Sequence, residues 1–96
     1  MKNHAFIIPV HKSPRLLARS LSILESPNHF FFIHVDAKVK NYKSFVDACS
    51  GIKNVFFVKR IPVYHATISQ VYASLILLDA VRSHEISFDF IHQILP

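Results

Sequence analysis

Residues 30–38 read FFFIHVDAK, an apolar run that ends on a carboxylate followed closely by a lysine. The apolar stretch from Phe30 to Val35 is typical of a parallel strand that is covered on both faces. Aspartate is unfavourable inside a strand but common where a strand gives way to a functional loop. Asp36 is therefore predicted at the carboxyl end of a central strand, either as a ligand-binding group or as a cap on the turn that follows.

The segments before this strand predict another strand and a helix. Residues 5–10, AFIIPV, form a short apolar run, in which Pro9 predicts an edge position or a bulge because proline cannot donate to a sheet. Ser13 stands where a helix N-cap is expected, and Pro14 fits the first helical position. Leucines at helical spacing follow, and Pro27 closes the helix.

The segments after it continue the alternation. Residues 41–49 predict a short helix that Gly51 ends in the left-handed conformation, and residues 55–58 predict a third strand. Residues 69–81 have the most regular helical period, and residues 88–91 begin a fourth strand. The order predicts an α/β fold that is Rossmann-like, with a mostly parallel sheet and flanking helices. The apolar positions of the last helix include Val71, Leu75, Leu78 and Val81.

Composition narrows the class of protein. The chain has 96 residues, 51% of them hydrophobic and 18% charged, which is typical of one folded domain or a piece of one. Its single glycine excludes a P-loop and a G-x-G-x-x-G dinucleotide fingerprint. The formal charge of +5 suits an anionic partner, or reflects acidic residues in a missing remainder. The basic residues are scattered and no nucleic-acid-binding motif occurs, so we do not expect nucleic acid as a partner.

Cys49 is the only cysteine, which excludes an internal disulfide and fits inert packing better than a nucleophile. No apolar run approaches the ~20 residues needed to cross a bilayer, and the start of the chain lacks the features of a signal peptide. We therefore expect a cytoplasmic protein, and peripheral association with a membrane stays open.

Three segments follow predicted strands at their carboxyl ends, where open parallel sheets bind ligands: residues 10–12, 36–38 and 59–65. A carboxylate there can accept a hydrogen bond from a uracil N3–H or a ribose hydroxyl, and lysine and arginine can neutralise a diphosphate. The ring of Tyr64 or His65 could stack on a base. The three segments together predict a nucleotide-binding site.

Other chemistry is less well supported. His34 is predicted to be a buried histidine hydrogen-bonded to backbone rather than half of a metal pair with Asp36, because the seven histidines show no repeated ligand spacing. Lys38 and Lys40 also fit a solvated turn. No serine stands on a nucleophile elbow, so a hydrolase triad is not indicated. We expect neither a metal ion nor another cofactor.

The chain resembles the amino-terminal part of the core-2/I-branching family of β-1,6-N-acetylglucosaminyltransferases, which also includes peptide O-xylosyltransferases. The matching stretches are, in order, AFIIPVHKSPRLLARSLSIL, FFFIHVDAK, NVFFVKRIPVYHATISQVYASLILL and FDFIH. The resemblance implies the nucleotide-binding half of a GT-A glycosyltransferase fold that works without a divalent cation. The chain agrees in lacking a D-x-D motif, so a basic side chain would neutralise the departing diphosphate.

The resemblance also implies site residues. The nucleotide-contacting stretch after the first strand matches Val10, His11 and Lys12, and the second stretch matches Asp36, Ala37 and Lys38, with the aspartate facing the uridine. The family places an aromatic residue four positions before the serine that matches Ser69. That position is His65 here, so the chain departs from the pattern unless Tyr64 takes the role after a shift of one residue.

The family carries a catalytic glutamate and a diphosphate-holding basic pair beyond the fourth strand, and the chain has neither. Residues 1–96 are therefore expected to be the donor-binding part of a truncated glycosyltransferase domain, inactive alone. Its expected ligand is a UDP-sugar such as UDP-GlcNAc or UDP-xylose, with a glycan or protein acceptor in the full-length family. The alternatives are a non-catalytic nucleotide-binding remnant and a non-functional truncated product that folds poorly and exposes a sheet edge.

Overall fold

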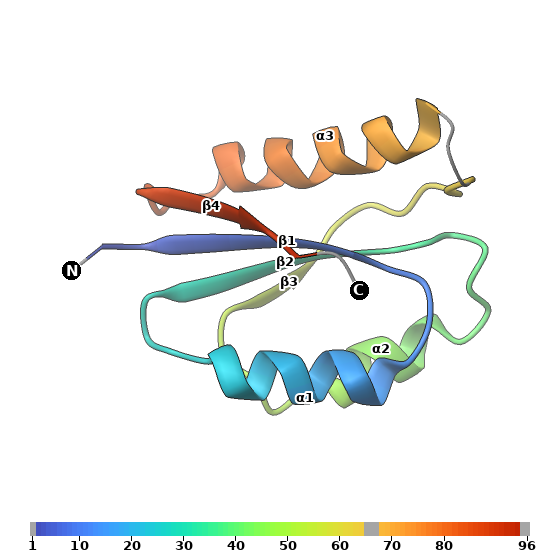
Figure 1. The fold of residues 1–96 in the computed structure, drawn as a ribbon, viewed down its shortest axis with the longest axis horizontal. Helices are drawn as coiled ribbons and strands as arrows, with labels where there is room; N and C mark the ends of the chain where they lie inside the picture. The colour runs from blue at the N-terminus through green and yellow to red at the C-terminus, as the bar shows by residue number, and fades with distance from the viewer. Residues whose placement is uncertain (1, 65–67, 95–96) are drawn as a thin grey trace.

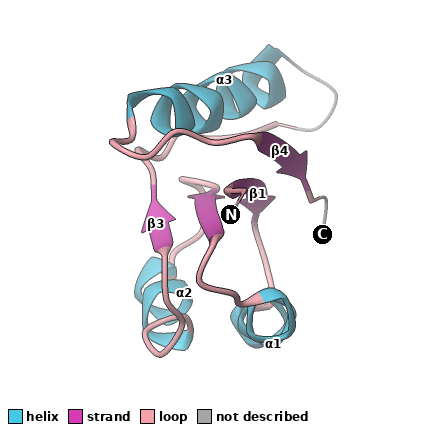
Figure 2. Cartoon of the chain, turned by 90° about the vertical axis from the view of Figure 1, so that its left-hand side faces the viewer, coloured by secondary structure: helices cyan, strands magenta, loops and turns pink. Residues whose placement is uncertain are grey.

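The computed structural model describes residues 2–64 and 68–94. Its elements are β1 (His4–Val10), α1 (Pro14–Leu24), β2 (His29–Val35), α2 (Tyr42–Ala48), β3 (Val55–Phe57), α3 (Ile68–Ser83) and β4 (Phe90–Gln93). The strands form one parallel sheet in the order β3-β2-β1-β4. Helices α1 and α2 cover one face and α3 covers the other (Figures 1 and 2). The arrangement confirms the predicted α/β class.

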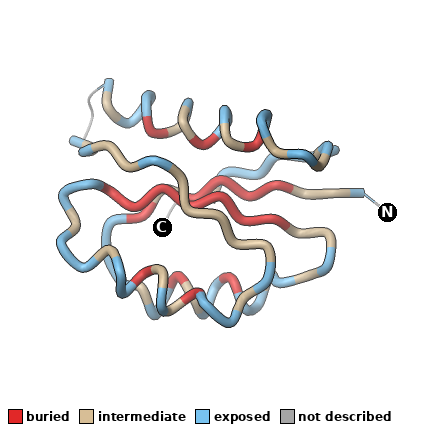
Figure 3. Tube along the Cα trace, turned by 180° about the vertical axis from the view of Figure 1, so that it is seen from behind, coloured by how far each residue is buried: buried red, intermediate tan, exposed pale blue. Residues whose placement is uncertain are grey.

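Strand β2 lies inside the sheet between β1 and β3, and it is buried along almost its whole length (Figure 3). Because side chains alternate across a strand, Phe31, Ile33 and Val35 enter the core under α1 and α2. Phe30 and Phe32 enter the core under α3. Both faces of the strand are covered by helices, which explains why the run 30–35 shows no polar alternation.

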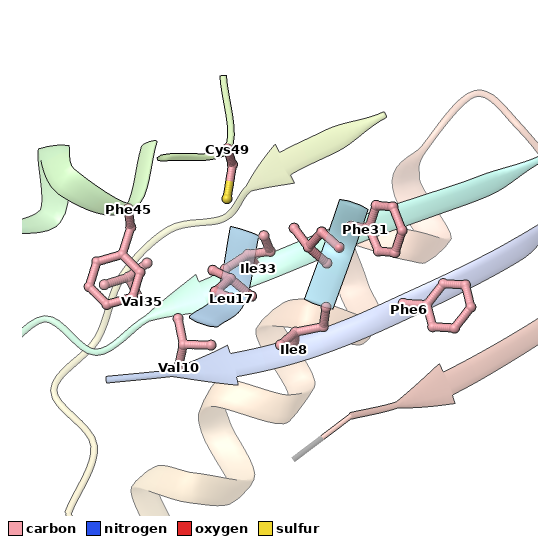
Figure 4. Packing of buried hydrophobic residues seen from close by; sticks show 10 residues of the cluster. Phe6, Ile8, Val10, Leu17, Phe31, Ile33, Val35, Phe45 and Cys49 are labelled. Atoms are coloured by element: carbon pink, nitrogen blue, oxygen red, sulfur yellow. The ribbon is translucent and has the colours of Figure 1, made fainter. Parts of the chain in front are cut away.

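The first core fills the space between the sheet and helices α1 and α2 (Figure 4). Phe45 of α2 is fully buried there, and Cys49 just after α2 is 2% exposed. Burial raises the pKa of the Cys49 thiol, which favours the unreactive protonated form and agrees with its predicted packing role. The buried members are Phe6, Ile8, Val10, Leu17, Leu21, Phe31, Ile33, Val35, Phe45 and Cys49.

The second core lies between the sheet and α3, and the helix contributes Leu77 and Val81 to it. The predicted apolar positions of this helix fall mostly on its other side: Val71 is 51% exposed, Leu75 52% and Leu78 37%. The helix is apolar all round, so its period alone could not identify the side that meets the sheet. None of the helices among the described residues is long and apolar enough to span a membrane.

Pro9 lies in β1, an internal strand, yet it interrupts no hydrogen-bonded pairing. The neighbouring Val10 carbonyl accepts the Asp36 N–H, so the polar groups of Val10 face β2 and those of Pro9 face the β4 side. Strand β4 ends its pairing with β1 at Ile7 opposite Gln93. Within residues 2–64 and 68–94, Pro9 therefore lies beyond the end of that pairing, at a local edge as predicted.

One predicted turn role is wrong, and a second is confirmed only in position. Gly51 does not adopt a left-handed conformation; Asn54, with φ 61°, is the residue that does so before β3. Asparagine tolerates this region better than most residues, and Asn54 is held by its side-chain amide, which donates to the His29 carbonyl. Ser13 occupies the N-cap position of α1 but is left-handed as well, and its side chain makes no capping hydrogen bond. Its carbonyl accepts the N–H of Leu17, the first bond of the helix.

Candidate functional site

A cavity of about 640 Å³ lies between the carboxyl ends of β1 and β2 and the start of α3, which begins above those strand ends (Figure 1). Val10 and His11 line it from the end of β1, and His34 and Asp36 line it from the end of β2. The opposite wall is formed by α3 through Gln70, Val71, Ala73 and Ser74. The cavity thus forms at the sheet edge where ligands of parallel sheets bind.

Asp36 is 7% exposed and joins two loops at this edge. Its Oδ1 accepts the backbone N–H of Lys38 at 2.9 Å and the backbone N–H of Val63 at 3.1 Å. Its Oδ2 lies 3.6 Å from the Lys38 ammonium. One oxygen therefore caps the turn, as the alternative interpretation predicts, and it also anchors the segment after β3. The same residue lines the cavity, so the two roles are compatible.

Lys38 and Tyr64 lie beside Asp36. The Lys38 ammonium stands 4.5 Å from the centre of the Tyr64 ring, a cation–π contact, and the Lys38 side chain is 47% exposed. Tyr64 is 54% exposed, and its backbone N–H donates to the Ser69 hydroxyl at 2.8 Å. The structure thus brings three predicted residues from two loops together. His65, the other aromatic candidate, lies outside the described residues.

The remaining predicted residues differ in position. Val10 is 5% exposed, and its carbonyl accepts the N–H of Asp36 at 3.0 Å, which ties the ends of β1 and β2 together. His11 is exposed at the cavity. Four other predicted residues are exposed but do not line it: Lys12, Ala37, Lys38 and Tyr64. Ala37 instead donates its N–H to the Ile61 carbonyl at 3.0 Å, a structural contact between the loops.

Arg60 builds the loop that carries Asp36. Its Nε donates to the Val35 carbonyl at 3.2 Å, and its Nη2 donates to the carbonyls of Asp36 at 3.0 Å and Val39 at 2.8 Å. The guanidinium also stacks on Tyr42, with Cζ 4.2 Å from the ring centre. The sequence suggested a diphosphate ligand in this segment, whereas Arg60 holds backbone. In the sequence, the only signal of this role was the position of Arg60 just after the third predicted strand.

His34 is 1% exposed and accepts the Ile61 N–H at its Nε2, with 3.1 Å between the nitrogens. This bond confirms the predicted buried, backbone-bonded histidine, and it requires a neutral ring. Burial lowers the pKa of His34, the Arg60 charge lowers it further, and the Asp36 charge acts in the opposite direction. Among the described residues, no group of three or more His, Cys, Asp or Glu side chains is arranged to hold a metal ion.

The lowered pKa of His34 predicts a loss of stability in acid. Between its folded pKa and the ordinary value of about 6.5 the unfolded chain binds more protons, so the free energy of unfolding falls as the pH falls through this window. We expect the urea midpoint to drop more from pH 7.5 to pH 5.5 in the natural chain than in His34→Gln, whose amide oxygen can still accept the Ile61 N–H. Equal drops would show that other groups cause the acid response.

Comparison with known families places this site in context. A family model described as core-2/I-branching enzyme matches residues 4–91. The chain belongs to the core-2/I-branching enzyme family. This is a glycosyltransferase family, which indicates a general role in sugar transfer with a sugar donor and an acceptor. The search of curated proteins gave no match.

The match to the core-2/I-branching enzymes runs from the first strand into the fourth, so it includes the described residues that line the cavity except Gln93. Membership in the family indicates which class of ligand to test at the cavity, namely a sugar donor.

Proposed function

We propose that the cavity binds the nucleotide part of a UDP-sugar donor, such as UDP-GlcNAc or UDP-xylose. The observation that carries the proposal is the placement of Asp36, a carboxylate on the cavity wall at the carboxyl end of an internal strand. Family membership supports a sugar donor, and about 640 Å³ is within the range of small-molecule sites.

The neighbouring residues suit the parts of such a ligand. Oδ1 of Asp36 is engaged by backbone, so Oδ2 is the atom that would accept the uracil N3–H. Lys38, next to that oxygen and half exposed, would stand toward the ribose or the diphosphate. Tyr64 lies beside Lys38 and offers a ring face for stacking. Val10 and His11, which line the cavity, would enclose the base from the β1 side.

The proposed family reaction is an inverting, metal-independent displacement. The acceptor oxygen forms a bond to the anomeric carbon, the bond to the diphosphate oxygen breaks, and a general base takes the acceptor proton. Asp36 is the only carboxylate among the described residues that line the cavity, and two amides already bind its Oδ1. We therefore propose that these 96 residues bind the donor without transferring the sugar.

Calorimetric titration tests this function. We expect UDP and UDP-GlcNAc to bind one per chain, and CDP to bind on the order of tenfold more weakly because cytosine presents a lone pair in place of the N3–H. No sugar transfer or release should accompany binding. Absence of heat with UDP up to millimolar concentration, in a sample that unfolds cooperatively, would overturn the proposal and favour a remnant without a donor site.

A further inference from the structure

Two histidines from neighbouring strands meet on the sheet. His4 opens β1 and His92 lies in the neighbouring strand β4. The Nδ1 of His4 is 3.0 Å from the Nε2 of His92, and the two rings are within 17° of parallel. Both nitrogens lie in an exposed setting, so water and small ions can reach them.

Aromatic neighbours hold both rings in place. His4 stacks on Phe90 with ring centres 5.0 Å apart, and His92 stacks on Phe6 at 4.9 Å. His29 meets the edge of His4, and its Nδ1 must donate to the Leu24 carbonyl, 2.7 Å away, because a carbonyl only accepts. The Nδ1 of His29 is therefore engaged with backbone, and only His4 and His92 face each other through their ring nitrogens.

We propose that His4 and His92 form a two-histidine binding site for a late first-row divalent metal ion of the Zn²⁺ class. A metal ion lies about 2.0–2.1 Å from each histidine nitrogen, so two tetrahedral ligand nitrogens are separated by about 3.3 Å. The observed 3.0 Å is a few tenths shorter, so the ion would require a small separation of the rings and a turn of both toward it. The ring that donates the shared hydrogen would then carry its proton on its other nitrogen. Water would complete the coordination, because no third His, Cys, Asp or Glu in the described part joins the pair.

Such an ion would fasten β4 to the sheet. Strand β4 is four residues long, exposed throughout, and paired on one side only, with β1. The nearby charges are Lys2, whose ammonium stands over Phe90, and Asp89, whose Oδ2 accepts the Asn3 N–H. The positive charge of the lysine opposes a cation, so we expect weaker binding than beside acidic neighbours alone. His4 lies at the start of β1, away from the cavity, whereas His92 precedes Gln93, which lines the cavity.

The test is a Zn²⁺ titration of the whole chain at pH 7.5, followed by calorimetry. We expect one ion per chain, and at least about tenfold weaker binding in His4→Gln and in His92→Gln. His11→Gln is the matched control, because it removes an exposed histidine at the opposite end of β1 and should leave the affinity unchanged. Unchanged affinity in both variants of the pair, or loss in the control, would overturn the site.

A second measurement needs no substitution and so remains valid if a variant unfolds. In ¹⁵N spectra of the natural chain, Zn²⁺ should shift the Nδ1 resonance of His4 and the Nε2 resonance of His92 first, and EDTA should reverse both shifts. Zn²⁺ should also raise the Tm, since an ion that binds only the folded chain stabilises it. Shifts confined to other histidines would show adventitious binding and overturn the proposal.

Discussion

Asp36→Ala is expected to abolish UDP binding and to destabilise the fold, whereas Asp36→Asn is expected to weaken binding and leave the fold nearly intact. The alanine variant leaves the backbone N–H groups of Lys38 and Val63 without their partner, which costs up to about 1–3 kcal/mol each and less where water can reach these part-buried groups. We therefore expect the free energy of unfolding to fall by about 2–4 kcal/mol in urea titrations.

The asparagine variant separates the two roles of Asp36. Its amide oxygen can keep both backbone hydrogen bonds, while an NH₂ group replaces the oxygen that faces Lys38. The lost ion pair is partly exposed and contributes at most about 1 kcal/mol. The lost acceptor for a uracil N3–H should weaken UDP binding about 10–100-fold in calorimetry. If Asp36→Asn binds UDP as the natural chain does, Asp36 serves only as a turn cap.

The position of Asp36 could be predicted because the signal is local. An apolar run that stops on a carboxylate identifies a strand end, and the structure places β2 at His29–Val35. The partners of Asp36 could not be predicted, since Val63 lies 27 residues further along the chain. The same holds for Arg60, which reaches back to three carbonyls at the end of β2 and beyond it. Contacts between loops depend on the sheet order, which no local pattern contains.

Turn conformations were the least predictable feature for a different reason. Glycine is the commonest left-handed residue, yet Gly51 is not left-handed, and Ser13 and Asn54 are. Asn54 precedes β3, where the chain must reverse to place Val55 beside Phe31. The amide of its side chain compensates by binding the His29 carbonyl on the adjacent strand. The backbone turn that the sheet requires before β3 thus decided which residue is left-handed, and it outweighed the intrinsic preference of glycine for that conformation.

Leu77→Ala is expected to cause the largest loss of stability on α3, and Leu75→Ala is its matched control on the same helix. Leu77 is fully buried against the sheet, so its truncation should cost about 2–5 kcal/mol, whereas Leu75 is 52% exposed and should change stability by about 0.5 kcal/mol or less. For a chain of this size the first change lowers the Tm by roughly 10–25 °C in a thermal scan.

The variants Leu77→Ala and Leu75→Ala also test whether the chain folds as one cooperative unit. They show in addition whether α3 is needed for UDP binding in the cavity. Gln70, Ala73 and Ser74 of this helix form a wall of the cavity, so loosening α3 in Leu77→Ala should remove UDP binding even at temperatures where the sheet persists. Leu75→Ala should bind UDP normally. A poorly folded product would show no sharp transition in any of the three proteins. If Leu75→Ala proves as damaging as Leu77→Ala, the outer side of α3 is buried in solution, and self-association rather than the isolated fold sets its stability.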